Sequence, residues 1–445
     1  GLYWALAQEQ WPRLLKAIDS WMEFQQWQSY RQEGERFCWA IVARAEQQDK
    51  ANGVVPPDCL RLWVRALLWM STVNGSDRRA AIDNSQLALA LLERPELAGQ
   101  DRRREEALAR SILGFNLTMM DLSESERQMT QALNIYEALG DQWGIAQSLS
   151  SLGGLDLARG RLGAALERTE AAYEIRRAMG DQPAQSRSLN NLGIIHKWQG
   201  HLDSAEWFHR EMVNLKRDIN DYSTLADSQA NFVQTLNHVG KYEEAYQVSL
   251  KALELARALG NETQEAIITV AAGNTLLNLG QYGQAHQMVV ETLPILKEKG
   301  QRIHEGVLHH LLGALALVNG SYSEAQAAFE TCLGIFQKIT QLTVVWPLSG
   351  LGYTAYHQGD LPAAKKYTVA AMADALSSKN FFIVRALPAA ALLLAAGGKV
   401  QRAVEAWSLA KSYAHVANSK WFEDIAGWKL EEVAAMAPSG TIATT

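Results

Sequence analysis

Apolar residues recur at helical spacing along almost the whole chain, in paired segments separated by a glycine. The stretch "AQSLSSLGGLDLAR" at 146–159 precedes Gly160, and "LGAALERTEAAYEIRRAM" at 162–179 follows it. In both segments apolar residues return every three or four positions, which is the period of an amphipathic helix. The pattern therefore predicts a helical hairpin, and its repetition predicts an all-α chain.

The central glycines recur at nearly constant spacing, at Gly160, Gly200, Gly240, Gly280, Gly320, Gly359 and Gly398. An alanine stands at the fifth position after each: Ala165, Ala205, Ala245, Ala285, Ala325, Ala364 and Ala403. A glycine stands at the seventh position before it in five rows (Gly153, Gly193, Gly273, Gly313, Gly352), with Val233 and Ala391 in the other two. We expect the central glycine to end the first helix in a left-handed conformation, and the small residues to let the two helices approach closely.

Helix-capping residues separate successive rows. Gly140-Asp141, Gly180-Asp181, Asn220-Asp221 and Gly260-Asn261 each pair a helix-closing residue with a residue that caps the next helix. Pro183 and Pro362 suit first turns, whereas Pro294 and Pro388 are predicted to lie inside helices and to kink them.

The repeat register sets the expected organisation. Residues 57–419 are predicted to form the array, with Gly75 and Ala80 marking an early hairpin and Met120 replacing the glycine of the next row. An irregular helical pair is expected over 1–56, a capping helix over 420–437 and a disordered tail over 438–445. About ten hairpins would then stack into a right-handed α-solenoid. The chain opens directly on the helical "GLYWALAQEQ", which suggests a piece of a longer polypeptide that has lost an upstream module.

The glycine and alanine columns resemble the tetratricopeptide repeat (TPR) over roughly 57–417, in a long variety of about 40 residues. Rows such as "SLNNLGIIHKWQGHLDSAEWFHREMV" are also similar to kinesin light chain repeats. The stretch 138–181 and the opening "SWMEFQQWQSYRQEGERFCWAIVARAE" resemble bacterial STAND regulators, the signal-transduction ATPases with numerous domains. That resemblance implies that the superhelix is a sensor for an inducer or a protein partner, working with an upstream ATPase module.

Composition excludes several classes of function. A net charge of −6 and a pI near 6.0 give no electrostatic footprint for nucleic acid, and the one basic run, "DRRREE", is neutralised by its own acids. The longest apolar stretch, "ALPAAALLLAAGG", is too short to span a membrane. Three widely spaced cysteines give no disulfide framework, so we expect a cytoplasmic protein.

Motifs for catalysis, metals or cofactors are not apparent. The run "GLDLARGRLG" lacks the lysine and serine or threonine of a phosphate-binding loop, and it ends a helix where such a loop begins one. His304, His309 and His310 do not share one helical face, so a zinc site is not expected. His196 occupies an otherwise apolar column and is interpreted as a hydrogen-bonded core histidine.

The first helix of each hairpin is expected to line the concave side of the stack. The columns that should face a groove are positions −13, −10, −6, −3 and −2 relative to each central glycine. The predicted ligand-binding residues from these columns are Arg187, Asn190, Lys197, Trp198, Asp227, Gln234, Asn237, His238, Asn274, Asn278, His310, Trp346, Tyr353, Tyr356 and His357. Earlier rows add Arg65, Trp69 and Arg110. Amides and aromatic rings suit an extended peptide or a small inducer, and Trp346 and Tyr353 are expected to be exposed.

Two alternatives stay open at this point. Any single residue of the columns could belong to an ordinary solvated helix face. Half of the 14 tryptophans lie between Trp4 and Trp69, where they could form a capping core or an interface. We predict a non-catalytic, cofactor-free sensor of a STAND-type regulator; a free-standing scaffold bridging protein partners is the alternative, and a hidden hydrolase relying on His196 or His310 is a third hypothesis.

Overall fold

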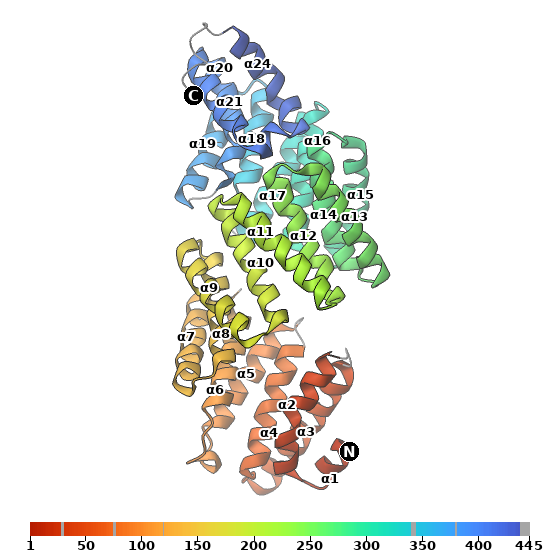
Figure 1. Ribbon diagram of the computed structural model, residues 1–445, viewed down its shortest axis with the longest axis vertical. Coiled ribbons are helices and arrows are strands. Elements are labelled where there is room, and N and C mark those ends of the chain that lie inside the picture. Colours follow the sequence, from red (N-terminus) through yellow and green to blue (C-terminus); the bar gives the residue numbers. More distant parts are fainter. Residues whose placement is uncertain (28–30, 74–76, 119, 340–343, 379–380, 437–445) are drawn as a thin grey trace. The chain divides into compact units, whose positions relative to one another are not determined.

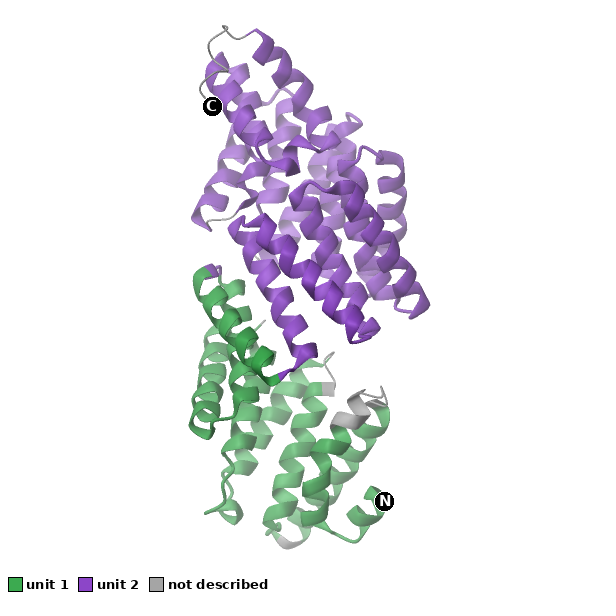
Figure 2. Ribbon diagram, viewed as in Figure 1, with its two compact units in different colours: residues 1–159, 163–179 green, residues 160–162, 180–445 purple. Residues whose placement is uncertain are grey.

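The computed structural model describes residues 1–445 except 28–30, 74–76, 119, 340–343, 379–380 and 437–445 (Figure 1). The described part consists of helices joined by short turns and contains no strand, so the all-α prediction is confirmed. The chain divides into two compact units, residues 1–159 with 163–179 and residues 160–162 with 180–445, which we call unit 1 and unit 2 (Figure 2).

The described part of unit 1 contains nine helices and one short 3-10 turn. They are α1 Leu2–Ala7, α2 Trp11–Trp27, α3 Arg31–Asn52, α4 Pro57–Val73, α5 Arg78–Leu92, η1 Pro95–Leu97, α6 Arg103–Leu117, α7 Leu122–Leu139, α8 Gln142–Ala158 and α9 Leu162–Met179. The hairpins α4–α5 and α6–α7 are extensively packed pairs. Up to Asn52, the described residues form three helices, where the sequence predicted a pair.

Unit 2 continues with the hairpins of the regular rows. Its helices are α10 Gln182–Gln199, α11 Leu202–Asp218, α12 Tyr222–Val239, α13 Tyr242–Ala258, α14 Glu262–Asn278, α15 Tyr282–Glu298, α16 Arg302–Val318, α17 Tyr322–Ile339, α18 Val345–His357, α19 Leu361–Ser377, η2 Phe381–Arg385, α20 Leu387–Ala396, α21 Val400–Lys411, α22 Ala414–Ala417, α23 Lys420–Phe422, η3 Glu423–Gly427 and α24 Trp428–Ala435. Each odd-numbered helix from α11 to α19 packs against the preceding even-numbered one.

The glycine and alanine columns have the roles that their spacing predicts. All seven central glycines, from Gly160 to Gly398, have positive φ, where a side chain would be strained. The alanines of the second column are all buried. A Cβ on Gly193 would lie 2.5 Å from the His209 ring, so this column permits the close packing of α10 on α11.

The predicted caps are also present. Asp141, Asp181, Asp221 and Asn261 each accept a hydrogen bond from a backbone N–H in the first turn of the following helix. Asn220 replaces the usual glycine with a φ of 56°. Pro294 lies inside α15 as predicted. The expectation for Pro388 is wrong: α20 begins at Leu387, so this proline lies in the first turn and interrupts no hydrogen-bond ladder.

The described part of the predicted capping helix, 420–437, is helical from Lys420 to Ala435, as α23, the π-helical turn η3 and α24 in direct succession. The short helix α22 precedes it. The side chains of this region include some of the largest fully buried ones, among them Trp421 and Phe422. The predictions for Gly75 and for the tail 438–445 concern positions outside the described residues.

The tryptophans between Trp4 and Trp69 whose side chains are described differ in burial, and Trp21 and Trp69 are half-buried. Trp11 and Trp63 are buried in the N-terminal core, as a capping core requires, whereas Trp4 and Trp39 are exposed. The three cysteines are buried and unpaired, and burial raises the pKa of Cys38 and of Cys59 to about 12, so these thiols stay protonated at neutral pH. Within the described residues, no helix combines the length and apolar character that crossing a membrane demands.

Candidate functional site

The inner layer of each unit is formed by the first helices of its hairpins. In unit 2, α10, α12, α14, α16 and α18 contact one another in sequence, in addition to their hairpin partners. In unit 1, α4, α6 and α8 do the same. We call these two layers the inner faces of unit 2 and unit 1.

The predicted ligand-binding residues on the inner face of unit 2 differ widely in exposure. Arg187 and Asp227 are exposed. The half-buried residues are Asn190, Trp198, Gln234, Asn274, Trp346 and His357, and the buried ones are Lys197, Asn237, His238, Asn278, His310, Tyr353 and Tyr356. The column pattern therefore identified inward positions, but the structure covers many of them.

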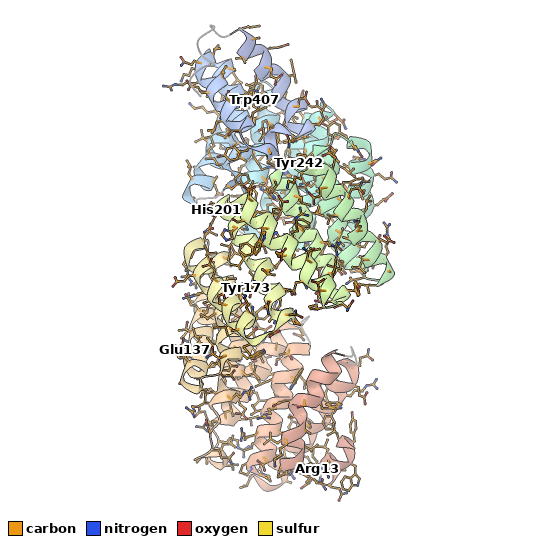
Figure 3. All side chains as sticks on the ribbon, in the orientation of Figure 1. Arg13, Glu137, Tyr173, His201, Tyr242 and Trp407 are labelled. Carbon is orange, nitrogen blue, oxygen red and sulfur yellow. The ribbon has the colours of Figure 1, made fainter. Side chains whose placement is uncertain are left out.

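Residues 414–427 of the same chain cover these positions, and we call them the C-terminal segment. His415 Nδ1 lies 3.0 Å from the carbonyl oxygen of Asn237, at the end of α12. The hydroxyl of Tyr242, labelled in Figure 3, donates to the carbonyl oxygen of His415 at 2.6 Å. The segment thus passes over the ends of the helices that carry the predicted columns.

Further contacts of the C-terminal segment follow the inner face from α14 to α18. Ser419 Oγ donates to Asn278 Oδ1 at 2.7 Å, and Trp421 Nε1 donates to the carbonyl oxygen of Ala314 at 3.0 Å. His357 Nε2 lies 2.8 Å from the carbonyl oxygen of Ile425. The columns at positions −6, −3 and −2 therefore do contact a polypeptide, and that polypeptide belongs to the same chain.

The expected exposure of the aromatic pair Trp346 and Tyr353 is corrected accordingly. Tyr353 is only 1% exposed, and its hydroxyl donates to the carbonyl oxygen of Arg385 at 2.8 Å. Trp346 is half-buried against Phe382, with ring centroids 5.4 Å apart. Tyr353 also packs on Trp421 and Phe422 of the C-terminal segment, and Trp346 also lies under the Arg385 guanidinium, so replacing either ring would disturb the fold as well as any binding.

Unit 1 retains a cavity of about 670 Å³ at its inner face. Its lining comes from α2, α4, α6, α7 and α8 and comprises Asp19, Arg65, Leu68, Trp69, Thr72, Arg104, Glu105, Leu108, Ile112, Tyr136, Asp141 and Trp143. This volume lies within the range of pockets that take small ligands or a few peptide residues.

The charged groups of this cavity are paired across helices. Arg65 of α4 donates to Asp19 Oδ2 at 2.7 Å and to Glu105 Oε1 at 3.1 Å, and Glu105 also accepts from Arg61 at 2.9 Å. Glu105 is 4% exposed, so these two arginines supply the positive charge that a buried carboxylate needs. At the rim, Arg104 Nε lies 3.4 Å from Asp141 Oδ2.

Aromatic side chains supply the apolar surface of the same cavity. Trp143 is 47% exposed, whereas Tyr136 is buried, and burial raises the pKa of its hydroxyl to about 12. A Cβ on Gly144 would overlap the Tyr136 ring, so this glycine allows α8 to pack against it. The cavity thus offers one accessible indole beside paired charges, a combination that suits peptide side chains.

Sequence reasoning found part of this site. Arg65 and Trp69 belong to the predicted inward columns and line the cavity, whereas Arg110, from the same columns, instead bonds Glu106, Gln128 and Gln131. Trp143, Arg104 and Glu105 were not singled out. Asp141 was recognised only as a cap, and its second contact with Arg104 had no sequence signal because Arg104 lies outside the inward columns, in the preceding row.

The histidines considered for metal binding are His304, His309 and His310 of α16. Within the described residues no group of three or more His, Cys, Asp or Glu side chains is arranged to hold a metal ion. His310 is buried beside Arg385, whose Nη2 lies 3.2 Å from His310 Nε2. His196 is half-buried and stacks on Phe208 at 5.1 Å, which is a partly exposed position instead of the predicted core one.

Comparisons with known proteins identify the fold. No protein-family model matches the sequence, and the search of curated proteins gives no match. The structure is similar to a Rap protein complexed with competence and sporulation factor, at 15% identity and a TM-score of 0.56, over 83% of this chain and 99% of that one. It is also similar to the Rap conjugation gene regulator of plasmid pLS20 in complex with the Phr* peptide, at 16% identity and a TM-score of 0.51, over 73% and 95% of the two chains.

A STAND protein with a tetratricopeptide repeat sensor from Pyrococcus horikoshii matches more weakly. It shares 16% identity over 89% of this chain and 54% of that one, with a TM-score of 0.43. The Rap likenesses, with the repeated hairpins and their glycine and alanine columns, place the fold. The chain is an all-α helical-repeat protein of the tetratricopeptide type.

Proposed function

We propose that the chain is a non-catalytic TPR-type binding region that takes a peptide segment of a partner at the cavity of unit 1. The observation that carries this proposal is the contrast between the two inner faces. That of unit 2 is covered by the C-terminal segment, whereas unit 1 has a cavity of about 670 Å³ with an accessible tryptophan at its rim. Two of the similar structures are complexes with a named factor or peptide, which supports a peptide as the ligand class.

The residues of the cavity have different roles in this proposal. Trp69 and Trp143 provide flat apolar surface for a side chain of the peptide. Arg104, whose side chain is 75% exposed, can exchange its contact with Asp141 for a carboxylate of the ligand. Arg65 is held by Asp19 and Glu105 and positions the cavity wall. Because each lining carboxylate is paired with an arginine, we assign these groups to recognition instead of proton transfer.

Peptide selection on the intact chain tests the proposal. A random dodecapeptide phage library is panned on the immobilised protein, and enriched peptides are synthesised for titration calorimetry. Trp143→Ala should weaken their binding by about 30-fold, the effect of losing an interface anchor worth roughly 2 kcal/mol. The matched control is Trp207→Ala, because Trp207 is a 53% exposed tryptophan of unit 2. Failure to enrich any peptide, or equal binding by the two variants, would reject the cavity as the site.

The finer assignment follows from the resemblance to STAND regulators. We propose that the chain is the cytoplasmic sensor region of such a regulator, and that its ligand is the inducer or partner that precedes ATPase assembly. The full reading frame tests this directly: an encoded P-loop ATPase module upstream of Gly1 supports it. A frame without one rejects it and favours a scaffold that joins two protein partners.

A further inference from the structure

Two buried cations in unit 2 have no acidic partner among the described residues. Arg385 of η2 is 5% exposed and Lys197 of α10 is 6% exposed. The Arg385 guanidinium donates to His415 Nε2 at 3.0 Å and to His310 Nε2 at 3.2 Å. In contrast, Lys216, which is buried to the same degree as Lys197, contacts Asp221 Oδ2 at 3.2 Å. In the part of the chain that the structure describes, one buried lysine is thus paired and the other has no counter-charge.

His238 connects the two cations. It is buried, and its ring centroid lies 5.5 Å from that of His415, which contacts Arg385 directly. The end of α10 reaches the same place, because the ring of Trp198, the neighbour of Lys197 in the chain, lies 5.0 Å from that of Phe382, which lies 4.9 Å from the His238 ring. Burial and the charges of Lys197 and Arg385 lower the pKa of His238. The nitrogen His238 Nδ1 donates to the carbonyl oxygen of Gln234 at 2.6 Å, which fixes the neutral ring with its other nitrogen unprotonated.

Hydrogen-bond donors without acceptors surround the same cations. Because His310 Nε2 accepts from Arg385, its Nδ1 carries the proton, and this buried atom has no partner among the described residues. Trp346 Nε1 is a buried donor without a partner in the same sense, whereas Asn237 has one unpartnered donor, Nδ2, and one unpartnered acceptor, Oδ1. The Trp346 ring lies 5.9 Å from the His310 ring and 6.3 Å from the His238 ring. The region thus has an excess of donors and positive charge over acceptors.

Burying a cation without a counter-charge is costly, and an unpaired buried N–H adds to that cost. A single oxyanion would offset both costs at once, because it brings negative charge and several acceptor lone pairs. Trp346 is half-buried, so part of this residue reaches solvent at the edge of the cluster.

We propose that Lys197, His238, His310, Trp346 and Arg385 form a binding site for a small oxyanion, a phosphate or a carboxylate group. The site lies inside unit 2 and is independent of the peptide site proposed in unit 1. Four of its five residues, Lys197, His238, His310 and Trp346, belong to the inward columns predicted from the sequence.

Thermal unfolding of the full chain tests the site. The melting temperature is measured at pH 7 against sodium phosphate and, separately, sodium acetate, with sodium chloride holding the ionic strength constant. A saturable rise in phosphate alone assigns a phosphate ligand, and a rise in acetate assigns a carboxylate. Lys197→Met should lower the apparent affinity at least tenfold, whereas Lys216→Met, the paired buried lysine, should leave it unchanged.

A second variant keeps the test valid if Lys197→Met fails to fold. Trp346→Phe keeps an aromatic ring but removes the unpaired N–H with the five-membered part of the indole, and it should weaken anion binding by about three- to tenfold. Circular dichroism verifies that each variant is folded. If neither salt raises the melting temperature above the chloride control, or if Lys197→Met and Trp346→Phe respond as the parent does, the proposal is wrong.

Discussion

Both units are built from the same helical hairpin, but the inner face of unit 1 retains a cavity whereas that of unit 2 is covered by residues of the same chain. In unit 1, Arg65 on the inner helix α4 is paired with Asp19 and Glu105, and a cavity of about 670 Å³ remains. In unit 2, the inner helices are covered by residues 414–427, and the buried Lys197 has no acidic partner among the residues described. A repeat pattern therefore decides which side chains turn inward, whereas the segments outside the repeat decide whether that surface stays open.

The strongest test of this contrast is removal of the anchor of the C-terminal segment. Trp421 is 2% exposed, packs on Tyr353 and Phe422, and donates to the carbonyl oxygen of Ala314. Trp421→Ala should destabilise unit 2 by about 3–5 kcal/mol through the cavity it leaves. Hydrogen exchange followed by mass spectrometry should show faster exchange in unit 2 and unchanged exchange in unit 1. Trp428→Ala is the control because Trp428 is 53% exposed; equal effects of both would mean that the segment is not part of the core.

The unpaired lysine makes the stability of unit 2 depend on pH in alkaline solution. Burial lowers the pKa of Lys197 from 10.5 to about 8. The unfolded chain then binds more protons between these values, so the free energy of unfolding rises as pH increases from about 8 to 10.5. The gain is about 3 kcal/mol at ~1.4 kcal/mol for each pH unit. Lys197→Met has no ammonium group to deprotonate, so its free energy of unfolding should lack this rise. In urea titrations in chloride buffers, Lys197→Met should be more stable than the parent at pH 7, and the difference should shrink towards pH 10.5. If the free energies of unfolding of the parent and of Lys197→Met change in parallel with pH, the pKa of Lys197 is not lowered in the folded protein.

Part of this difference could be predicted from sequence and part could not. The central glycines are set by local backbone geometry, and the inward columns by the helical period, so positions such as Asn237 and His310 were correctly placed on inner helices. The cover was not predictable, because contacts such as Ser419 with Asn278 join distant parts of the chain and leave no periodic trace. In unit 1, Arg65 and Trp69 lie in the inward columns, whereas Glu105 and Trp143 lie before the first of these columns in their rows and were therefore not singled out.

Alanine variants of two glycines measure the cost of backbone strain separately from the cost of contact with the C-terminal segment. Gly240 and Gly260 both have positive φ, at 76° and 65°. A Cβ on Gly240 would overlap the carbonyl oxygen of Ala414, whereas one on Gly260 meets nothing within 4 Å. In both alanine variants, the left-handed conformation should lower the free energy of unfolding by about 1 kcal/mol. In Gly240→Ala, overlap with the C-terminal segment should lower it by roughly 1–3 kcal/mol more. Equal urea midpoints for the two variants would show that the C-terminal segment shifts to accommodate the added Cβ with no loss of stability.

The smallest effect is expected at the rim of the unit 1 cavity. Arg104 is 75% exposed and touches Asp141 at 3.4 Å, so the pair is screened by water and contributes little to folding. Arg104→Met should change the free energy of unfolding by less than about 0.5 kcal/mol. Asp141→Ala should cost about 1 kcal/mol, because Asp141 also caps α8 through the N–H of Gly144. A loss above about 1 kcal/mol in Arg104→Met would exceed what an exposed ion pair contributes. The rim arginine would then be part of the folded framework and unable to exchange partners, and the cavity of unit 1 would resemble the fixed interior of unit 2.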